Sequence, residues 1–260
     1  MDFKFACQTI SWGDQQHEHF PEVFAEISAA GFTGVEIGYR RIEAIDPFLL
    51  QQMLNDSGLT LIASHIGGNL LDRKQANSEW DSLEHVVERL LTLKVPRLLL
   101  SGIKYCENID EFQHVMDSFR HAIEHCKKNG IELLYHNHDW EFKDADCYAF
   151  KELLANESSR FCPDVGWFLK GGVGVDGTLD LLKGRIRAVH FKDFSDATDN
   201  SRPVFLGDGK AQLAEAAAWL KRNIEEPLWI VAEQDSTESS TAYMANRNAD
   251  YLKRVFASDC

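Results

Sequence analysis

Side chains that can bind a metal ion or transfer a proton follow four consecutive apolar segments in the second half of the chain. These segments end in Y-H-N-H-D-W-E (135–141), P-D-V-G-W (163–167), V-H-F-K-D (189–193) and V-A-E-Q-D (231–235). Charged groups beside buried segments are costly unless they are paired or bind a cation. A mixed set of histidines and carboxylates without a thiolate is typical of sites for Mn²⁺, Mg²⁺, Co²⁺ or Zn²⁺, and it does not choose among these ions. The four ends together predict one divalent metal ion.

Each of these residues also has a purely structural interpretation. Asp164 or Glu233 could accept hydrogen bonds at a helix N-terminus, and His190 could be a core histidine with satisfied partners. The succession of four such ends favours the functional interpretation. Four other histidines fall within helical patterns and are expected on solvated helix faces, namely His85, His114, His121 and His125.

Eight short β-rich runs alternate with longer segments in which apolar residues recur at i, i+3 and i+4, a pattern that indicates alternating strands and helices. Strands are expected at 3–9, 34–37, 59–65, 97–101, 131–136, 160–162, 186–191 and 228–233. Helices are expected at about 20–30, 46–57, 80–93, 109–129, 147–156, 177–184, 211–223 and 239–256. The runs are too continuously apolar to have one wet face, so a parallel sheet is expected.

These repeating units predict an α/β fold, a single (β/α)8 TIM barrel over residues 1–260, with an open doubly wound sheet as the alternative. Catalytic groups of such barrels lie at the C-terminal ends of the strands. The four polar segment ends would therefore share one mouth of the barrel.

The amino-acid composition limits the binding partners and the cellular location that we expect for this protein. The chain has 41 acidic and 27 basic residues and a net charge of −14, which disfavours nucleic acid as a partner. The six cysteines form no C-x-x-C pair, a usage typical of reduced thiols in the cytoplasm, and no cysteine metal cluster is expected. Since neither a signal peptide nor a long apolar segment is present, we expect a cytoplasmic protein without a membrane partner. The sequence leaves the oligomeric state open, although helix-rich barrels often pair into homodimers.

The segment 172–177 matches the G-x-G-x-x-G pattern of dinucleotide-binding proteins. That pattern binds a cofactor when it directly joins a first strand to its helix and an acidic residue follows about 20 residues later. Here it lies late in the chain, after W-F-L-K (167–170), and the next strand ends near His190. We interpret it as a flexible βα loop.

At the polar segment ends the sequence resembles the xylose isomerase-like TIM barrels, a family of sugar isomerases and epimerases, inosose dehydratase, hydroxypyruvate isomerase and endonuclease IV. The resemblance extends over essentially the whole chain. It implies a metal ion bound at the ends of strands five to eight, and Asp164, His190 and Glu233 match the last three ligand positions. At strand five most members have glutamate, whereas this chain has His136 within Y-H-N-H-D-x-E-F, a branch in which Glu141 lies near the site. His136 is the favoured fourth ligand and Glu141 the alternative.

The first half of the chain supports the resemblance. The segments I-S-W-G-D (10–14) and G-F-T-G-V-E-I-G (31–38) are similar to those of inosose dehydratase. The tryptophans are expected to form apolar walls for a sugar ring, with burial in the core as the alternative. The residues expected to contact a small-molecule sugar or polyol are His65, Trp12, Glu36, Trp167 and Trp140.

The resemblance also implies a chemistry. Its small-molecule members remove a proton from the carbon beside a carbonyl, and a metal ion stabilises the resulting enediolate. Glu233 together with Glu141 or His138 could supply the base and the acid. Lys192 could bind a substrate hydroxyl or the oxyanion, or could simply form a surface pair with Asp193.

The leading functional hypothesis is a metal-dependent isomerase or epimerase of a free or phosphorylated sugar. The alternative is a lyase of the inosose dehydratase type, acting on a keto-inositol or a keto-sugar. An endonuclease IV-like enzyme would need a larger histidine-rich cluster and a cationic groove, and a metal-free binding module is the remaining hypothesis. The sequence leaves the sugar open, because specificity is expected in the loops at 66–80 and 193–210.

Overall fold

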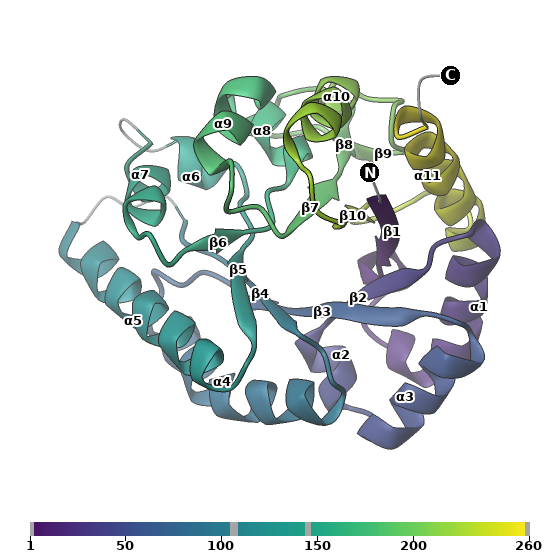
Figure 1. Ribbon diagram of the computed structural model, residues 1–260, viewed down its shortest axis with the longest axis horizontal. Coiled ribbons are helices and arrows are strands. Elements are labelled where there is room, and N and C mark those ends of the chain that lie inside the picture. Colours follow the sequence, from purple (N-terminus) through teal and green to yellow (C-terminus); the bar gives the residue numbers. More distant parts are fainter. Residues whose placement is uncertain (1–2, 105–108, 144–146, 258–260) are drawn as a thin grey trace.

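Eight parallel strands form the centre of the computed structural model, which describes residues 3–104, 109–143 and 147–257 (Figure 1). The strands are β1 (Phe3–Gln8), β2 (Gly34–Gly38), β3 (Thr60–Gly67), β4 (Arg97–Ser101), β5 (Glu132–Tyr135), β6 (Arg160–Phe161), β7 (Ala188–Phe191) and β10 (Leu228–Ala232). Their order is β6-β5-β4-β3-β2-β1-β10-β7. Parallel bridges from Phe161 to Ile186 and from Asp164 to His190 connect the two outer strands. The prediction of a (β/α)8 barrel is confirmed, and the open sheet is excluded.

Helices surround the strands on the outside (Figure 1). The longer ones are α1 (Phe20–Ala30), α3 (Pro47–Asp56), α4 (Arg73–Thr92), α5 (Ile109–Lys128), α7 (Tyr148–Ala155), α9 (Val175–Leu182), α10 (Leu213–Asn223) and α11 (Thr241–Val255). The shorter ones are η1 (Ile10–Trp12), η2 (Gln16–His19), α2 (Tyr39–Glu43), α6 (Trp140–Lys143) and α8 (Val165–Gly171). Among the helices within the described residues, none combines the length and the apolar character that crossing a membrane requires.

Local capping explains where the helix boundaries differ from the prediction. The carboxylate of Asp72 accepts hydrogen bonds from the backbone N–H groups of Lys74 and Gln75, so α4 begins at Arg73 and not at residue 80. Most of the segment 66–80 is therefore strand end and helix, and the prediction of a loop there is wrong.

His85, His114 and His121 are exposed on their helices, as expected, and His125 is partly buried.

The segment 172–177 connects two helices. Gly172 ends α8 with a positive φ of 71°, Gly174 is the N-cap of α9, and Gly177 lies within α9. The interpretation of this segment as a flexible βα loop is wrong, because helix α8 directly follows the end of strand six.

The loop expected at 193–210 contains a small antiparallel ladder of β8 (Asp193–Phe194) and β9 (Pro203–Val204). The buried carboxylate of Asp193 accepts hydrogen bonds from the backbone N–H groups of Gly207, Gly209 and Ala211 at 2.9–3.0 Å. The alternative of a surface pair between Lys192 and Asp193 is therefore wrong, since Asp193 folds this loop.

Apolar side chains pack both outside and inside the barrel. The larger cluster lies between the strands and the helices. The smaller cluster consists of Ala6, Ile62, Ala63, Leu99, Leu134, Cys162, Ala188 and Val231. This inner cluster supports the strand ends that carry the polar residues.

Candidate metal centre

The four predicted metal ligands converge at one mouth of the barrel. His136 follows β5, Asp164 follows β6, His190 lies on β7 and Glu233 follows β10. One donor atom from each side chain lies within 4.8 Å of the others, and all four residues are buried. Four segments distant in sequence thus supply two imidazoles and two carboxylates to one small volume.

Asp164 uses its two carboxylate oxygens differently. Oδ1 accepts hydrogen bonds from the backbone N–H groups of Gly166 at 2.8 Å and Trp167 at 3.3 Å, and so caps α8. Oδ2 has no hydrogen-bond partner within the described part of the chain and lies 3.9 Å from Nε2 of His136. Burial raises the pKa of Asp164 to about 7. The helix-cap interpretation and the ligand interpretation therefore apply to different atoms of the same side chain.

His190 lies between two carboxylates. Its Nε2 is 2.8 Å from Oε2 of Glu36, and its Nδ1 contacts Oε2 of Glu233. Burial by itself lowers the pKa of His190, but the charges of Glu36, Cys162 and Glu233 raise it well above its ordinary value. Glu36 is fully buried beside this imidazole, so it contacts a candidate ligand directly.

Lys192 balances the acidic charge of the site. Its ammonium donates hydrogen bonds to Oε1 of Glu233 at 2.9 Å and to Oδ1 of Asp235 at 2.7 Å, although the side chain is only 1% exposed. Burial raises the pKa of Glu233, but the Lys192 and His190 charges lower it well below its ordinary value. Glu233 is therefore ionised, and its two carboxylate oxygens contact His190 and Lys192.

Glu141 lies outside the group of four. It is fully buried, its Oε1 accepts a hydrogen bond from the Tyr135 hydroxyl at 2.6 Å, and its Oε2 accepts one from the His138 backbone N–H at 2.8 Å. Burial raises its pKa to about 8. Of the two alternatives for the fourth ligand, the geometry favours His136, and Glu141 fixes the loop after β5.

A cavity of about 420 Å³ opens at the same mouth, beside the group of four. Its lining residues include several side chains suited to binding a polar ligand, among them Arg41, His65, Ser101, Lys104, His138 and Trp140. His65 and His138 border both regions, since each ring centroid is 5.2 Å from that of His136. The cavity is thus the place from which a small molecule can reach the candidate metal position.

The three predicted aromatic walls have different surroundings. Trp140 lines the cavity, stacked on His138 with 4.1 Å between ring centroids. Trp167 contacts His138 from another side, and Lys192 lies 4.9 Å from its ring. Trp12 donates its indole N–H to Glu26 at 2.8 Å and is not among the cavity-lining residues that the structure describes. A sugar contact by Trp12 or Trp167 stays a prediction.

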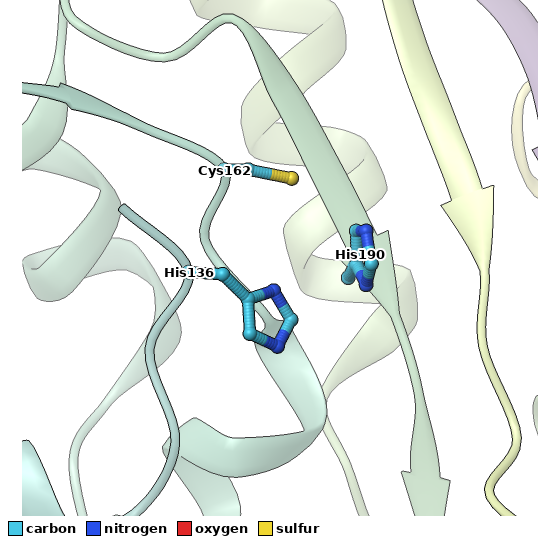
Figure 2. Close-up of side chains that lie close together, drawn as sticks. All are labelled: His136, Cys162 and His190. Carbon is cyan, nitrogen blue, oxygen red and sulfur yellow. The ribbon is translucent and has the colours of Figure 1, made fainter. Parts of the chain in front are cut away.

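Sequence reasoning missed several residues at this mouth, among them Arg41 and Lys104 of the cavity lining. Asn137 links the ends of β5 and β6, and Ser101 contacts Nε2 of His65 at 2.9 Å. Cys162 lies with His136 and His190 in a second group of donor atoms, also within 4.8 Å of one another (Figure 2). The expectation that no cysteine takes part in a metal cluster therefore overlooked one candidate. The sequence could have identified Cys162 by its position, because it stands two residues before Asp164 on the same strand end.

Unpaired donor atoms show that the site fits a cation. Nδ1 of His136, Oδ2 of Asp164 and Oε1 of Glu36 are buried and have no hydrogen-bond partner among the residues that the structure describes. Such groups are costly when unsatisfied, and coordination to a divalent ion would satisfy nitrogen and oxygen donors together. The donor set suits Mn²⁺, Mg²⁺, Co²⁺ or Zn²⁺.

Known proteins that are similar to this chain in sequence or in structure include sugar-converting enzymes of the same fold. Two inosose dehydratases of Mesomycoplasma hyopneumoniae, from strains J and 7448, are 22% and 24% identical over 92% of this chain and 89% of their own length. A sugar phosphate isomerase/epimerase from Parabacteroides distasonis superposes with a TM-score of 0.78, at 21% identity over 96% of this chain and 93% of that one. A D-allulose 3-epimerase from Methylomonas sp., solved with D-allulose, gives 0.78 at 13% identity over 97% of each chain. Residues 24–255 match the family model described as xylose isomerase-like TIM barrel, and the chain belongs to this family.

Proposed function

We propose that the protein is a divalent-metal-dependent isomerase or epimerase that acts on a keto or aldo sugar, free or phosphorylated, by removing a proton beside the carbonyl. The convergence of His136, Asp164, His190 and Glu233 carries this proposal. These four side chains would hold the ion. When bound, it would stabilise the negative charge that develops on the substrate oxygens as the proton leaves.

The surrounding residues can perform the proton transfer. His138 lines the cavity, and its buried Nδ1 has no hydrogen-bond partner in the described residues, so we assign this imidazole the role of accepting or returning a proton. Glu233 is the carboxylate of the acid–base pair that it forms with His138. Lys192 holds Glu233 in place through a hydrogen bond. Glu141 acts on this chemistry indirectly, by fixing the backbone of His138.

The cavity supports a sugar as the substrate. Trp140 offers an apolar face to the ring, while Gln8, Asn69 and Gln75 offer amides to hydroxyl groups. Arg41 and Lys104 add two cations, and no carboxylate occurs among the lining residues in the described part of the chain. This lining accommodates hydroxyl groups and also a phosphate.

A dehydratase is the second candidate, and one specific observation favours it. An epimerase that removes the proton on one face of the substrate and returns it on the other can use one glutamate on each face. Here the end of β5 carries His136 at the position of one of these carboxylates. One carboxylate with a neighbouring histidine suffices to remove an α-proton and expel a β-hydroxyl as water. The inosose dehydratases among the relatives are consistent with this outcome.

Deuterium exchange tests the proposal. The protein is loaded with Mn²⁺ and incubated in D₂O with free and phosphorylated keto-sugars and keto-inositols, and the products are followed by NMR. Deuterium at an α-carbon without loss of water indicates isomerase or epimerase activity, whereas a 1,2-diketone or its enol tautomer, formed with loss of one water, indicates the dehydratase. Absence of exchange in the metal-loaded protein across the panel would rule out both functions for these substrates. Glu88→Gln, which changes an exposed residue of α4 outside the cavity lining, serves as the control for handling of the protein.

A further inference from the structure

Cys162 lies directly beneath the metal centre. It follows β6, is fully buried, and belongs to the inner cluster of the barrel. Its sulfur and one ring nitrogen each of His136 and His190 lie within 4.8 Å of one another. Figure 2 shows the thiol pointing from its strand end toward the strand that carries His190, with the His136 ring on the adjacent strand end.

A second observation marks this position as able to bind a ligand. Across residues 3–104, 109–143 and 147–257, Nδ1 of His136 has no hydrogen-bond partner, although the residue is only 1% exposed. A buried nitrogen of this kind costs free energy unless something occupies the space beside it. An ion held by the sulfur and the two imidazoles would satisfy it.

The donor atoms around the two histidines fall into two distinct sets. One set joins His136 and His190 to Asp164 and Glu233, and the other joins the same histidines to Cys162. The sets share both histidines and lie within a few ångströms of each other, and two divalent ions that close would repel each other strongly, so we expect one ion at a time. The first set is rich in oxygen, and the second contains sulfur and nitrogen.

We propose that His136, Cys162 and His190 form a thiolate-containing position for a soft divalent ion such as Zn²⁺, Co²⁺ or Cd²⁺, in competition with the oxygen-rich position. Thiolate and imidazole ligands favour such ions, whereas Mg²⁺ and Mn²⁺ favour carboxylates. On binding, the thiol loses its proton to solvent and a metal–sulfur bond forms, with no change of oxidation state.

The geometry permits this coordination with a small adjustment. A tetrahedral ion with bonds of about 2.0–2.3 Å holds its ligand atoms roughly 3.5 Å apart. Since the three donor atoms already lie within 4.8 Å of one another, they need to approach by at most about 1.3 Å. Small side-chain rotations supply a movement of this size. A water molecule can complete the four ligands.

The consequence for the enzyme rests on the proposed function. A soft ion in the thiolate position takes both histidines from the oxygen-rich position, so Zn²⁺ or Cd²⁺ would displace Mn²⁺ or Mg²⁺ and block the reaction. Cys162 would thus determine which metals support activity and which inhibit it.

Optical spectroscopy with Co²⁺ tests the thiolate position without relying on activity. Metal-free, reduced protein is titrated anaerobically with Co²⁺. We expect a sulfur-to-cobalt charge-transfer band in the near ultraviolet that saturates at one equivalent. The band disappears in Cys162→Ser and persists in Cys126→Ser, a matched control in which the buried cysteine lies on α5. Cys162→Ser weakens Co²⁺ or Zn²⁺ binding by at least about tenfold and leaves Mn²⁺ binding unchanged.

A second measurement covers the case in which Cys162→Ser fails to fold. Cadmium NMR of the unmutated protein distinguishes a sulfur ligand from a site made of nitrogen and oxygen alone. Co²⁺ or Cd²⁺ bound without a sulfur signature overturns the thiolate position and leaves the proposed function standing. Failure of the protein to bind any divalent ion overturns both.

Discussion

Asn137 and Asp164 hold each other through two hydrogen bonds. The side-chain Oδ1 of Asn137 accepts from the Asp164 N–H at 3.0 Å, and its Nδ2 donates to the Asp164 carbonyl oxygen at 3.2 Å. Asn137 directly follows His136, so one buried amide fixes the ends of β5 and β6 relative to each other. It therefore positions two candidate ligands without contacting the ion.

Replacing Asn137 by alanine tests this positioning role. We expect Asn137→Ala to lower the affinity for Mn²⁺ by about 10–100-fold, because residues that orient metal ligands have effects of this size. Titration calorimetry or Mn²⁺ paramagnetic resonance measures the affinity. Asn129→Ala is the control, since the Asn129 side chain donates to the His125 carbonyl at the exposed end of α5. An affinity equal to that of the unmutated protein would show that β5 and β6 keep their positions without this amide.

Two substitutions at Asp164 separate the helix cap from the ligand. Asp164→Asn retains an oxygen that can cap α8 but replaces the unpaired Oδ2 with an amide nitrogen, so we expect metal content to be lost while the metal-free protein keeps its stability within about 0.5 kcal/mol. Asp164→Ala also removes the cap and should cost about 1 kcal/mol more. Elemental analysis and urea unfolding of the metal-free proteins provide the two readouts. Full metal content in Asp164→Asn would remove Asp164 from the ligand set.

The ammonium of Lys192 should be essential to the stability of the site. Lys192→Met leaves the buried carboxylate of Glu233 and the Asp235 side chain without their cation, and we expect the free energy of unfolding to fall by about 3–5 kcal/mol. Lys143→Met is a matched control, because Lys143 also contacts two carboxylates, those of Asp139 and Asp199, but its side chain is 38% exposed. That change should cost about 1 kcal/mol or less. Equal losses in chemical denaturation would contradict the difference in burial as the cause.

Glu141 should make stability depend on pH. Burial raises its pKa in the folded protein from 4.5 to about 8, so between these values the folded state binds more protons than the unfolded state. Its contribution is therefore fully present below about pH 4.5 and is lost as pH rises toward 8. We expect Glu141→Gln to reduce the fall in stability across this range, measured by urea unfolding from pH 5 to pH 8.

The comparison of variants isolates Glu141 from the other titrating groups. The quantity to follow is the difference in free energy of unfolding between the unmutated protein and Glu141→Gln at each pH. The exposed Glu88 provides a matched control as Glu88→Gln. A difference that does not change with pH would mean that Glu141 stays ionised through its hydrogen bonds with Tyr135 and His138.

Local sequence patterns were enough to predict the barrel and the position of most candidate ligands. Strand residues alternate between faces, and a polar residue just after an apolar run must lie at the strand end. This rule places Asp164, Glu233 and the segment that contains His190 at the barrel mouth, and the resemblance to the family singled out these three as ligands. The strand positions agree closely with the prediction because continuous apolar runs leave few other places to be buried.

Tertiary structure decided what these residues contact. Glu141 is five residues beyond His136, and only the path of the chain into α6 turns its carboxylate onto the Tyr135 hydroxyl. Trp12 points to Glu26 on another helix, and Cys162 meets two histidines from other strands. The sequence by itself determined which residue types lie at the mouth of the barrel, because burial and strand periodicity act over a few neighbouring residues. The tertiary structure decided which of them meet, because those contacts depend on how distant segments pack together.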